Sequence, residues 1–516
     1  MLRVSGGRDI LLSGWQNTKM KKHKKAVKRN TAGSLAFLQK PVHILFVCIF
    51  LIILMVVLCF SWVPYCLNIS AVFPNAICLL VGGGIGLVLY KMIQRIPISD
   101  RTFKIIIVAV FLILLAAQAA IVTFAYFDTG WDVQALVALS NHVVQRGPLP
   151  TGNYYLSLYP NNTFLVAVMS LIKMVPIFGG KRLFLLGINA LLVNLSGLLA
   201  CLTIKKLTSK KAAIFSIFII VPLLVLSPWI IIPYSDTFAV LFPILIFYIY
   251  ISKKKKWWRY LLLSFLSVVG FFIKPTVIIM LIAIGIAELL HCNKWKITKE
   301  RLQQFALLSA GAVLALALNV AGTMFIGFVP DKMVQSASMV HYLAMGQNEE
   351  MCGMYLGQDV TEMRYGPKFE LEKFVHRVST RDVPQQLNFF TKKLLINFND
   401  GTFAWSVEGN FYYIVPERDR PISVFLTNYF YNYGNNYAVF ATVVQIVWVL
   451  VLFGCVFIRQ TDKSSLALQL ALIGMFLFVM LFEARARYLF CYAPIFIVCA
   501  TMGLYALLEK VRKLHK

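Results

Sequence analysis

Charged side chains are scarce in this sequence. Only 14% of the 516 residues are charged, whereas 59% are hydrophobic. A soluble globular chain of this length cannot hide so much apolar surface, because polar side chains must cover its exterior. The shortage of charge therefore excludes an ordinary soluble protein and predicts an all-α polytopic membrane protein whose surface contacts lipid.

The usual signatures of metal sites and soluble enzymes are also missing. The ten cysteines form no CxxC pair and no zinc-type spacing, and most lie in apolar runs, so we expect no disulfide framework. No glycine-rich phosphate loop, Ser-His-Asp order or HExxH helix appears. No internal repeat is visible, which argues against a transporter built from inverted repeats.

Positive charge is abundant but unevenly placed. The net charge is +28, and Lys and Arg cluster in short segments between apolar runs. This pattern is typical of membrane topology and not of a nucleic-acid surface. The stretch MKKHKKAVKRN (20–30) predicts a basic cytosolic segment over 1–42 beside anionic lipid, instead of a cleavable signal. The residues leave open whether translation starts at Met1 or Met20.

Apolar runs long enough to cross about 30 Å of hydrocarbon predict the transmembrane helices. The twelve predicted spans are 43–64, 71–92, 104–126, 183–204, 211–228, 236–252, 259–274, 276–291, 303–327, 435–458, 464–482 and 488–508. A thirteenth run, 161–179, is short and contains Lys173. If it crossed fully, the basic loops after it would move outside, so we expect an interfacial or re-entrant helix there.

This topology puts both termini in the cytoplasm and two large segments outside. The predicted organisation is a transmembrane core over 43–327 with an outer loop at 127–182, an extracytoplasmic domain over 328–430, and C-terminal transmembrane helices over 431–516. The outer domain is rich in aromatic residues, so we expect a folded cap with short helices and not a disordered loop.

Two aspartates follow the third predicted span, in FDTGWD (127–132). Carboxylates at a membrane boundary are costly, so Asp128 and Asp132 are candidates for function. The apolar spacing after them predicts an amphipathic interfacial helix over 133–147. The structural alternative is that Asp132 only provides the N-cap of this helix while Asp128 lies in solvent.

Other charged residues lie at the same predicted boundary. Asp236 starts the sixth span, where helix capping is the alternative role, and Lys274 lies between two spans, where a snorkelling lysine is the alternative. The stretch LFEARARYLF (481–490) brings Arg485 and Arg487 to the outer face. Arginine is well suited to phosphate, so Lys274, Arg485 and Arg487 are candidates for binding a lipid phosphate, with a structural ion-pair cluster as the alternative.

Carboxylates and cations at an outer face suggest a particular chemistry. Nucleotides are lacking outside the cell, so a transferase there needs an activated donor delivered in the membrane, such as a sugar on a polyprenyl phosphate. An Asp would accept the proton of the acceptor hydroxyl, and cations would stabilise the departing phosphate. This direct displacement predicts inversion at the anomeric carbon.

The layout resembles the GT-C fold of integral-membrane glycosyltransferases, a class that includes the protein O-mannosyltransferases and the lipid A aminoarabinose transferase. The resemblance covers roughly residues 104–290 and rests on the acidic outer loop, on LYPNN (158–162), which is similar to a Tyr-Pro segment of those families, and on the EARAR stretch. It implies that Asp132 or its neighbour Asp128 is the catalytic base and that Asp236 is the second-loop acid. Three predicted spans precede the acidic loop, where those relatives usually have one.

Relatives of this class often place an acceptor-binding domain late in the chain. This implies acceptor contacts in the 328–430 domain, where His341, Asn348, Trp405 and Glu408 are the candidates. The sequence thus predicts an inverting membrane glycosyltransferase that moves a sugar from a polyprenyl-phosphate donor to a cell-surface glycan at the outer face of the cell membrane. The alternatives are a flippase or transporter of a lipid-linked saccharide, a surface-glycan polymerase or ligase, and a membrane scaffold.

No nucleotide cofactor and no nucleic-acid partner are expected. A divalent metal between Asp128, Asp132 and Asp236 stays open, because some members of the class use one and others do not. The sequence leaves the identity of the sugar and of the acceptor, and the oligomeric state, undetermined.

Overall fold

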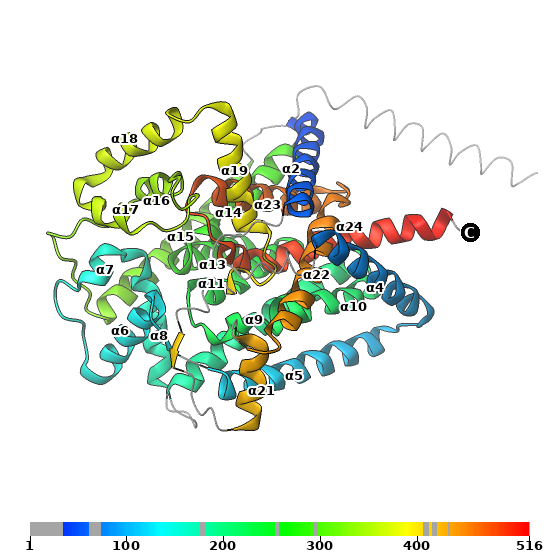
Figure 1. The fold of residues 1–516 in the computed structure, drawn as a ribbon, viewed down its shortest axis with the longest axis horizontal. Helices are drawn as coiled ribbons and strands as arrows, with labels where there is room; N and C mark the ends of the chain where they lie inside the picture. The colour runs from blue at the N-terminus through cyan, green and yellow to red at the C-terminus, as the bar shows by residue number, and fades with distance from the viewer. Residues whose placement is uncertain are drawn as a thin grey trace, which may run out of the picture.

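The computed structural model describes residues 35–60, 74–126, 128–175, 181–252, 257–292, 298–405, 412–414, 420–431 and 434–514. Helices dominate these segments (Figure 1). The strands among them are β1 (Asp128–Thr129) and β2 (Tyr412–Ile414), which pair antiparallel. The all-α membrane class predicted from the sequence therefore holds for the described chain.

Eight described helices are long and apolar enough to cross a membrane. They are α2 (Gln39–Cys59), α4 (Asn75–Arg95), α5 (Asp100–Phe124), α9 (Lys181–Leu207), α15 (Lys299–Phe325), α22 (Tyr437–Val456), α23 (Lys463–Leu481) and α24 (Ala493–Leu514), the last preceded by the 3₁₀ helix η8 (Ala486–Tyr492). Each coincides with a predicted span. A short 3₁₀ turn, η1 (Leu35–Leu38), precedes α2.

The other four predicted spans are shorter or interrupted. They correspond to α10 (Lys210–Ile220) with the π-helix η3 (Val221–Val225), α11 (Ser235–Phe238) with α12 (Leu241–Tyr250), α13 (Trp258–Ile273), and the 3₁₀ turn η5 (Pro275–Val277) with α14 (Ile278–Leu290). A helix of sixteen residues, such as α13, is only about 24 Å long. Eight of the twelve predicted spans therefore have helices of membrane length among the described residues, and the full count of twelve stays a prediction.

Proline and irregular backbone cause the interruption between α10 and α12. Pro222 lies in η3, and Pro228 opens the 3₁₀ helix η4 (Pro228–Ile231). Every residue from 227 to 240 is buried. Irregular backbone is tolerated at membrane depth only where protein covers it, so this segment belongs to the interior of the bundle.

The segment after α5 forms short helices. These are α6 (Asp132–Arg146), α7 (Tyr154–Leu158), the 3₁₀ turn η2 (Pro160–Asn162) and α8 (Thr163–Met174). The twelve residues of α8 are about 18 Å long, which is too short to cross about 30 Å of hydrocarbon. This length agrees with the expectation that 161–179 does not span the membrane.

The 328–430 segment folds into short helices, as the sequence predicted. They are α16 (Met339–Met345), α17 (Gly357–Glu362), the 3₁₀ turn η6 (Met363–Tyr365), α18 (Gly366–Ser379), α19 (Val383–Phe398) and α21 (Pro421–Phe430). Figure 1 shows α16, α17 and α18 gathered with α6 and α7 at one end of the molecule, while α24 points its C-terminus toward the opposite end. The β1–β2 pair also joins this late segment to the loop after α5.

Polar contacts near the C-terminal part of α24 join loops that the sequence analysis assigned to the cytoplasmic side. Lys211 donates to the Gln94 carbonyl at 2.7 Å, the Tyr90 hydroxyl donates to Glu509 at 2.8 Å, and Lys210 lies 3.3 Å from Asp100. The loops assigned to one side therefore share one end of the fold. Which side of the membrane this end faces stays a prediction.

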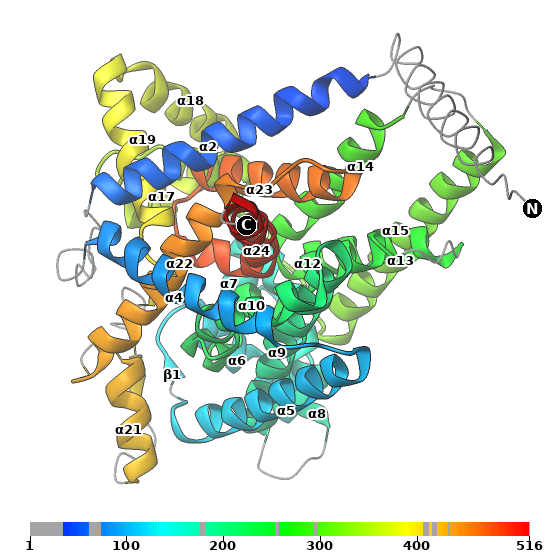
Figure 2. The same cartoon turned by 90° about the vertical axis from the view of Figure 1, so that its right-hand side faces the viewer.

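The C-terminal helix α24 is the most buried of the eight long helices. Figure 2 looks nearly along it and shows α22, α23, α10 and α12 around it. Gly503 of α24 lies directly against the Gly454 carbonyl of α22, where an added Cβ would clash. Small residues at helix crossings let membrane helices approach closely, which explains this tight pair.

Candidate active site

Asp132 is the first residue of α6, and its carboxylate faces another part of the chain. The Tyr234 hydroxyl donates to Asp132 Oδ2 at 3.0 Å. Trp131 occupies the N-cap position, and no side chain caps the helix. The alternative in which Asp132 serves only as the N-cap is therefore wrong. Its carboxylate bonds a hydroxyl from the segment before α11 instead of the amides of its own first turn.

Aromatic and cationic side chains surround this hydrogen bond. The rings of Trp131 and Tyr234 meet edge to face with centroids 5.2 Å apart. The guanidinium carbon of Arg487 lies 4.4 Å from the Trp131 centroid and 5.3 Å from the Tyr234 centroid. Such distances allow cation–π attraction. Asp132 and Arg487, which are far apart in the sequence, thus share the neighbours Trp131 and Tyr234.

Two tyrosines of the LYPNN region stand beside Asp132. The Asn162 amide donates to the Tyr155 hydroxyl at 2.9 Å, and the rings of Tyr155 and Tyr159 are 5.5 Å apart. Burial and then the charge of Asp132 raise the pKa of both tyrosines above the ordinary value, and a hydrogen bond with Asp132 raises the pKa of Tyr155 further. Both hydroxyls therefore stay protonated and can donate hydrogen bonds.

Asp236 lies next to Arg487 and forms a buried ion pair with Lys274. Its side chain is 1% exposed and is bonded by the Lys274 ammonium, whose side chain is 7% exposed. Arg487 Nε lies 3.8 Å from Asp236 Oδ2, and the Lys274 ammonium lies 4.5 Å from the Tyr488 ring centroid. The structure thus corrects two alternatives. Asp236 does not cap α11, and Lys274 does not snorkel to the surface.

The segment before η8 adds a second carboxylate. Arg485 Nε lies 3.1 Å from Glu483 Oε1, and the Tyr488 hydroxyl donates to Glu483 Oε2 at 2.6 Å. Tyr342 of α16 lies within electrostatic range of Glu483. Burial raises the pKa of this tyrosine most, and Glu483, Tyr159 and Asp132 raise it further. The 328–430 segment therefore contributes an aromatic side chain to the charged site.

The acceptor-binding residues expected in the outer domain do not gather at this site. His341 is 1% exposed and lies 3.4 Å from Glu370, and Asn348 is buried against the carbonyls of Met345 and Met354. Trp405 has no exposed surface and donates to the Phe430 carbonyl. All three side chains are buried in the structure, and their role in acceptor binding stays a prediction.

Two further predictions lie outside the described residues. Glu408 falls in the segment between 405 and 412, and the side chain of Asp128 is likewise outside the description, although its backbone pairs in β1. The choice between Asp128 and Asp132 as the base therefore stays a prediction. Within the described parts of the chain, no group of three His, Cys, Asp or Glu side chains that could hold a metal comes together.

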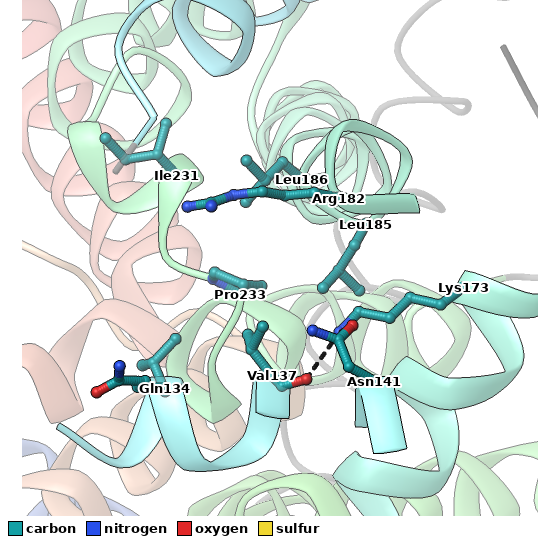
Figure 3. A pocket seen from close by; sticks show the side chains of 10 residues that line it. Gln134, Val137, Asn141, Lys173, Arg182, Leu185, Leu186, Ile231 and Pro233 are labelled. Carbon is teal, nitrogen blue, oxygen red and sulfur yellow. Dashed lines mark hydrogen bonds between the residues drawn. The ribbon is translucent and has the colours of Figure 1, made fainter. Parts of the chain in front are cut away.

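A cavity of about 220 Å³ adjoins the Asp132–Tyr234 pair (Figure 3). Val133, the residue after Asp132, and Pro233, the residue before Tyr234, both line it. Lys173 of α8 and Arg182 of α9 are its basic lining residues. The charged site and this cavity therefore share the first turn of α6 and the segment before α11.

Comparison with known proteins identifies a family. The family described as "conserved hypothetical integral membrane protein" matches residues 34–506. The chain belongs to this family. No curated protein and no solved structure matches it. Membership of this family agrees with the apolar helices of the fold and leaves the reaction open.

In this integral membrane protein, the site residues that sequence reasoning missed are tyrosines. Tyr155, Tyr234, Tyr342 and Tyr488 surround Asp132, Glu483 and the arginines. The run NYYLSLYP (153–160) contains three tyrosines within six positions, which was a usable signal. A search for charged residues overlooks them, because a tyrosine at a membrane boundary is usually an interfacial anchor.

Proposed function

We propose that this protein is an inverting glycosyltransferase that uses a polyprenyl-phosphate sugar at the outer face of the membrane. The observation that carries the proposal is the Asp132 carboxylate held by the Tyr234 hydroxyl and sharing its aromatic neighbours with Arg487. A base and a cation at one interfacial site suit the transfer of a sugar from a lipid phosphate.

In this mechanism Asp132 accepts the proton of the acceptor hydroxyl as its oxygen attacks the anomeric carbon. The bond between that carbon and the phosphate oxygen breaks with its electron pair, and polyprenyl phosphate leaves. Arg487 stabilises the charge that develops on the phosphate. Because the displacement is direct, the product has the inverted anomeric configuration.

Asp236 and Lys274 take positioning roles in this proposal. Asp236 is buried and lies 3.8 Å from Arg487, so it holds the guanidinium against Trp131 and does not reach a substrate. Lys274 compensates the Asp236 charge. Arg485, whose side chain is 23% exposed, is the more accessible cation of the EARAR stretch and is assigned a second phosphate contact.

Two tyrosines provide hydrogen-bond donors for the sugar. Tyr159 and Tyr342 stay protonated beside carboxylates, because burial and negative charge raise the pKa of each. The single hydroxyl proton of Tyr155 bonds Asp132 instead. Aromatic faces with polar tips are well suited to a sugar, which has apolar C–H faces and hydroxyl edges. Tyr342 comes from α16, so the 328–430 segment contributes one of these donors.

The test compares the purified wild type with Asp132→Asn in detergent, using a panel of radiolabelled polyprenyl-phosphate sugars and candidate glycan acceptors. Asn keeps the size of the side chain and accepts the Tyr234 hydrogen bond but cannot take the proton. We expect the wild type to consume one donor and Asp132→Asn to lose at least about a hundredfold in rate.

The matched control is Asp382→Asn. Asp382 is an exposed N-cap of α19 in the outer domain, and Asn caps helices equally well. It should retain wild-type turnover. Unchanged turnover in a folded Asp132→Asn variant would rule out Asp132 as the base and move the assignment to Asp128. If no donor is consumed although labelled lipid crosses the bilayer of proteoliposomes, the flippase alternative replaces the transferase.

A further inference from the structure

The cavity beside α6 has mostly apolar walls and the size of a small ligand. Its volume is about 220 Å³, which equals roughly seven water molecules. This is enough for one sugar ring and less than a drug-sized ligand occupies. The apolar lining residues are Val133, Val137, Leu185, Leu186, Ile231 and Pro233. An apolar space with a few polar groups is the usual form of a small-ligand site, so the polar groups decide what it binds.

The two cations of this cavity are engaged by the protein itself. The Lys173 ammonium donates to the Val137 carbonyl at 3.1 Å, the Ser140 hydroxyl at 2.6 Å and the Asn141 side-chain oxygen at 2.9 Å. An ammonium has three N–H donors, so none is left for a ligand. The Arg182 guanidinium lies over a tyrosine ring, with its central carbon 4.4 Å from the ring centroid, and has other partners as well. Recognition in this cavity therefore falls to its uncharged groups.

Two side-chain amides of α6 are these uncharged groups. Gln134 and Asn141 both line the cavity, and their spacing along α6 puts them on one face of the helix (Figure 3). The Asn141 oxygen accepts from Lys173, which leaves the NH₂ end of that amide for a ligand. Within the described parts of the chain, no partner bonds this NH₂ group or the Gln134 amide. The cavity therefore has amide N–H donors and the Gln134 carbonyl acceptor available.

This combination of groups suits an uncharged sugar ring. A pyranose has hydroxyls around its rim, which donate and accept hydrogen bonds, and apolar C–H groups on its faces. Amides bond such hydroxyls, and the leucines that α9 contributes, Leu185 and Leu186, can cover a C–H face. A carboxylate or phosphate fits less well, because burying a charge is costly where no charged donor is free to bond it.

The position of the cavity connects it with the reaction centre. Val133 and Pro233 line it, and they are the sequence neighbours of Asp132 and Tyr234, which share a hydrogen bond. We propose that this cavity is the subsite for one neutral sugar ring of the substrate, selected by the amides of Gln134 and Asn141. The role of this sugar as a substrate rests on the proposed function, whereas its binding can be measured without turnover.

The test measures sugar binding to the purified full-length protein in lipid nanodiscs, which avoid the sugar headgroups of common detergents. Saturation-transfer NMR compares neutral methyl hexopyranosides of the gluco, galacto and manno series with the matching methyl hexuronides. We expect at least one neutral glycoside to bind, and its uronide to bind more weakly. Gln134→Trp fills the cavity from an exposed position and should abolish binding. Asn141→Asp keeps the contact with Lys173 but removes the amide donors, so it should weaken binding about threefold to tenfold.

Gln145→Trp is the matched control, because Gln145 is an exposed glutamine of the same helix that does not line the cavity. It should bind the glycoside like the wild type, and thermal unfolding establishes that each variant is folded. Competition then identifies the source of the sugar. Displacement of the glycoside by a polyprenyl-phosphate sugar would assign the cavity to the donor, and displacement by a lipid-free oligosaccharide would assign it to the acceptor.

Three results would overturn the proposal. They are the absence of binding by every neutral glycoside, binding of a uronide as tight as that of its neutral counterpart, and wild-type binding by folded Gln134→Trp. None of these measurements needs turnover. A protein that binds the neutral glycoside in this cavity but transfers no sugar would therefore refute the proposed function and leave the binding site in place.

Discussion

The buried ion pair behind the site gives the sharpest stability prediction. Asp236 is 1% exposed and faces two cations, Lys274 and, at 3.8 Å, Arg487. Asp236→Ala leaves both cations without this carboxylate, and breaking a buried pair costs about 3–5 kcal/mol. Lys274→Met should cost less, because Asp236 keeps Arg487.

The chain contains a matched control for this change. Asp100 also faces two cations, Lys205 at 3.8 Å and Lys210 at 3.3 Å, but its side chain is 75% exposed. Exposed ion pairs contribute about 0–1 kcal/mol, so Asp100→Ala should have little effect. The comparison therefore isolates the contribution of burial from that of charge pairing.

The assay is unfolding of the purified protein in detergent, followed by circular dichroism for the wild type and each variant. The double variant Asp236→Ala with Lys274→Met should lose less than the sum of the two single losses, because the second change removes a cation that the first left uncompensated. If Asp236→Ala unfolds like Asp100→Ala, or if the two single losses simply add, the reasoning about this pair is refuted.

Three other contacts give separate expectations. Tyr234→Phe removes the hydrogen bond to Asp132, so transfer should slow while unfolding moves by only about 1 kcal/mol, as kinetics and denaturation would show. Burial and then the charge of Arg381 lower the pKa of Lys393 from 10.5 to about 7. The free energy of unfolding should therefore rise with pH between these two values, by at most about 1.4 kcal/mol per pH unit. Lys393→Met should abolish this pH dependence. Gly346→Ala should destabilise by roughly 1–3 kcal/mol, because its Cβ would clash with the Phe482 backbone.

Each of these expectations has its own check. The sign for lysine follows from proton counting: the unfolded chain keeps the proton to higher pH than the folded chain, so acidification toward pH 7 favours unfolding. Lys368→Met, at an exposed lysine of the same domain, should leave the slope intact; a slope that survives Lys393→Met would assign it to other groups. Gly357→Ala, where an added Cβ meets nothing, is the control for the glycine. A large unfolding effect of Tyr234→Phe would make that hydroxyl mainly structural.

Long apolar runs were predictable because lipid imposes a simple rule on the sequence. A helix such as α5 or α22 must be apolar over about twenty residues, and this is visible without any tertiary information. The same rule predicted four further spans, whose helices are shorter than the eight long ones. The sequence placed residues 229–235 between two predicted spans, and the structure buries this proline-containing segment inside the bundle, where an irregular backbone is tolerated.

The candidate site was predictable only in part. The sequence located Asp132, Asp236 and Arg487, because charge at a membrane boundary is rare and therefore informative. It did not predict their partners. Asp132 bonds Tyr234, 102 positions away, and Arg487 packs on Trp131, and no local pattern encodes contacts at such separations.

By itself, the sequence determined the membrane class, most of the long helices and the boundary at which charges gather, since these follow from the cost of placing polar groups in lipid. The tertiary structure alone decided that Asp236 is the buried carboxylate and that Asp132 accepts a hydrogen bond from the Tyr234 hydroxyl. Asp132 and Asp236 follow similar apolar runs, yet packing buries Asp236 between two cations and leaves Asp132 partly exposed beside tyrosines. That difference comes from which helices pack together, a property of the whole chain and not of either segment.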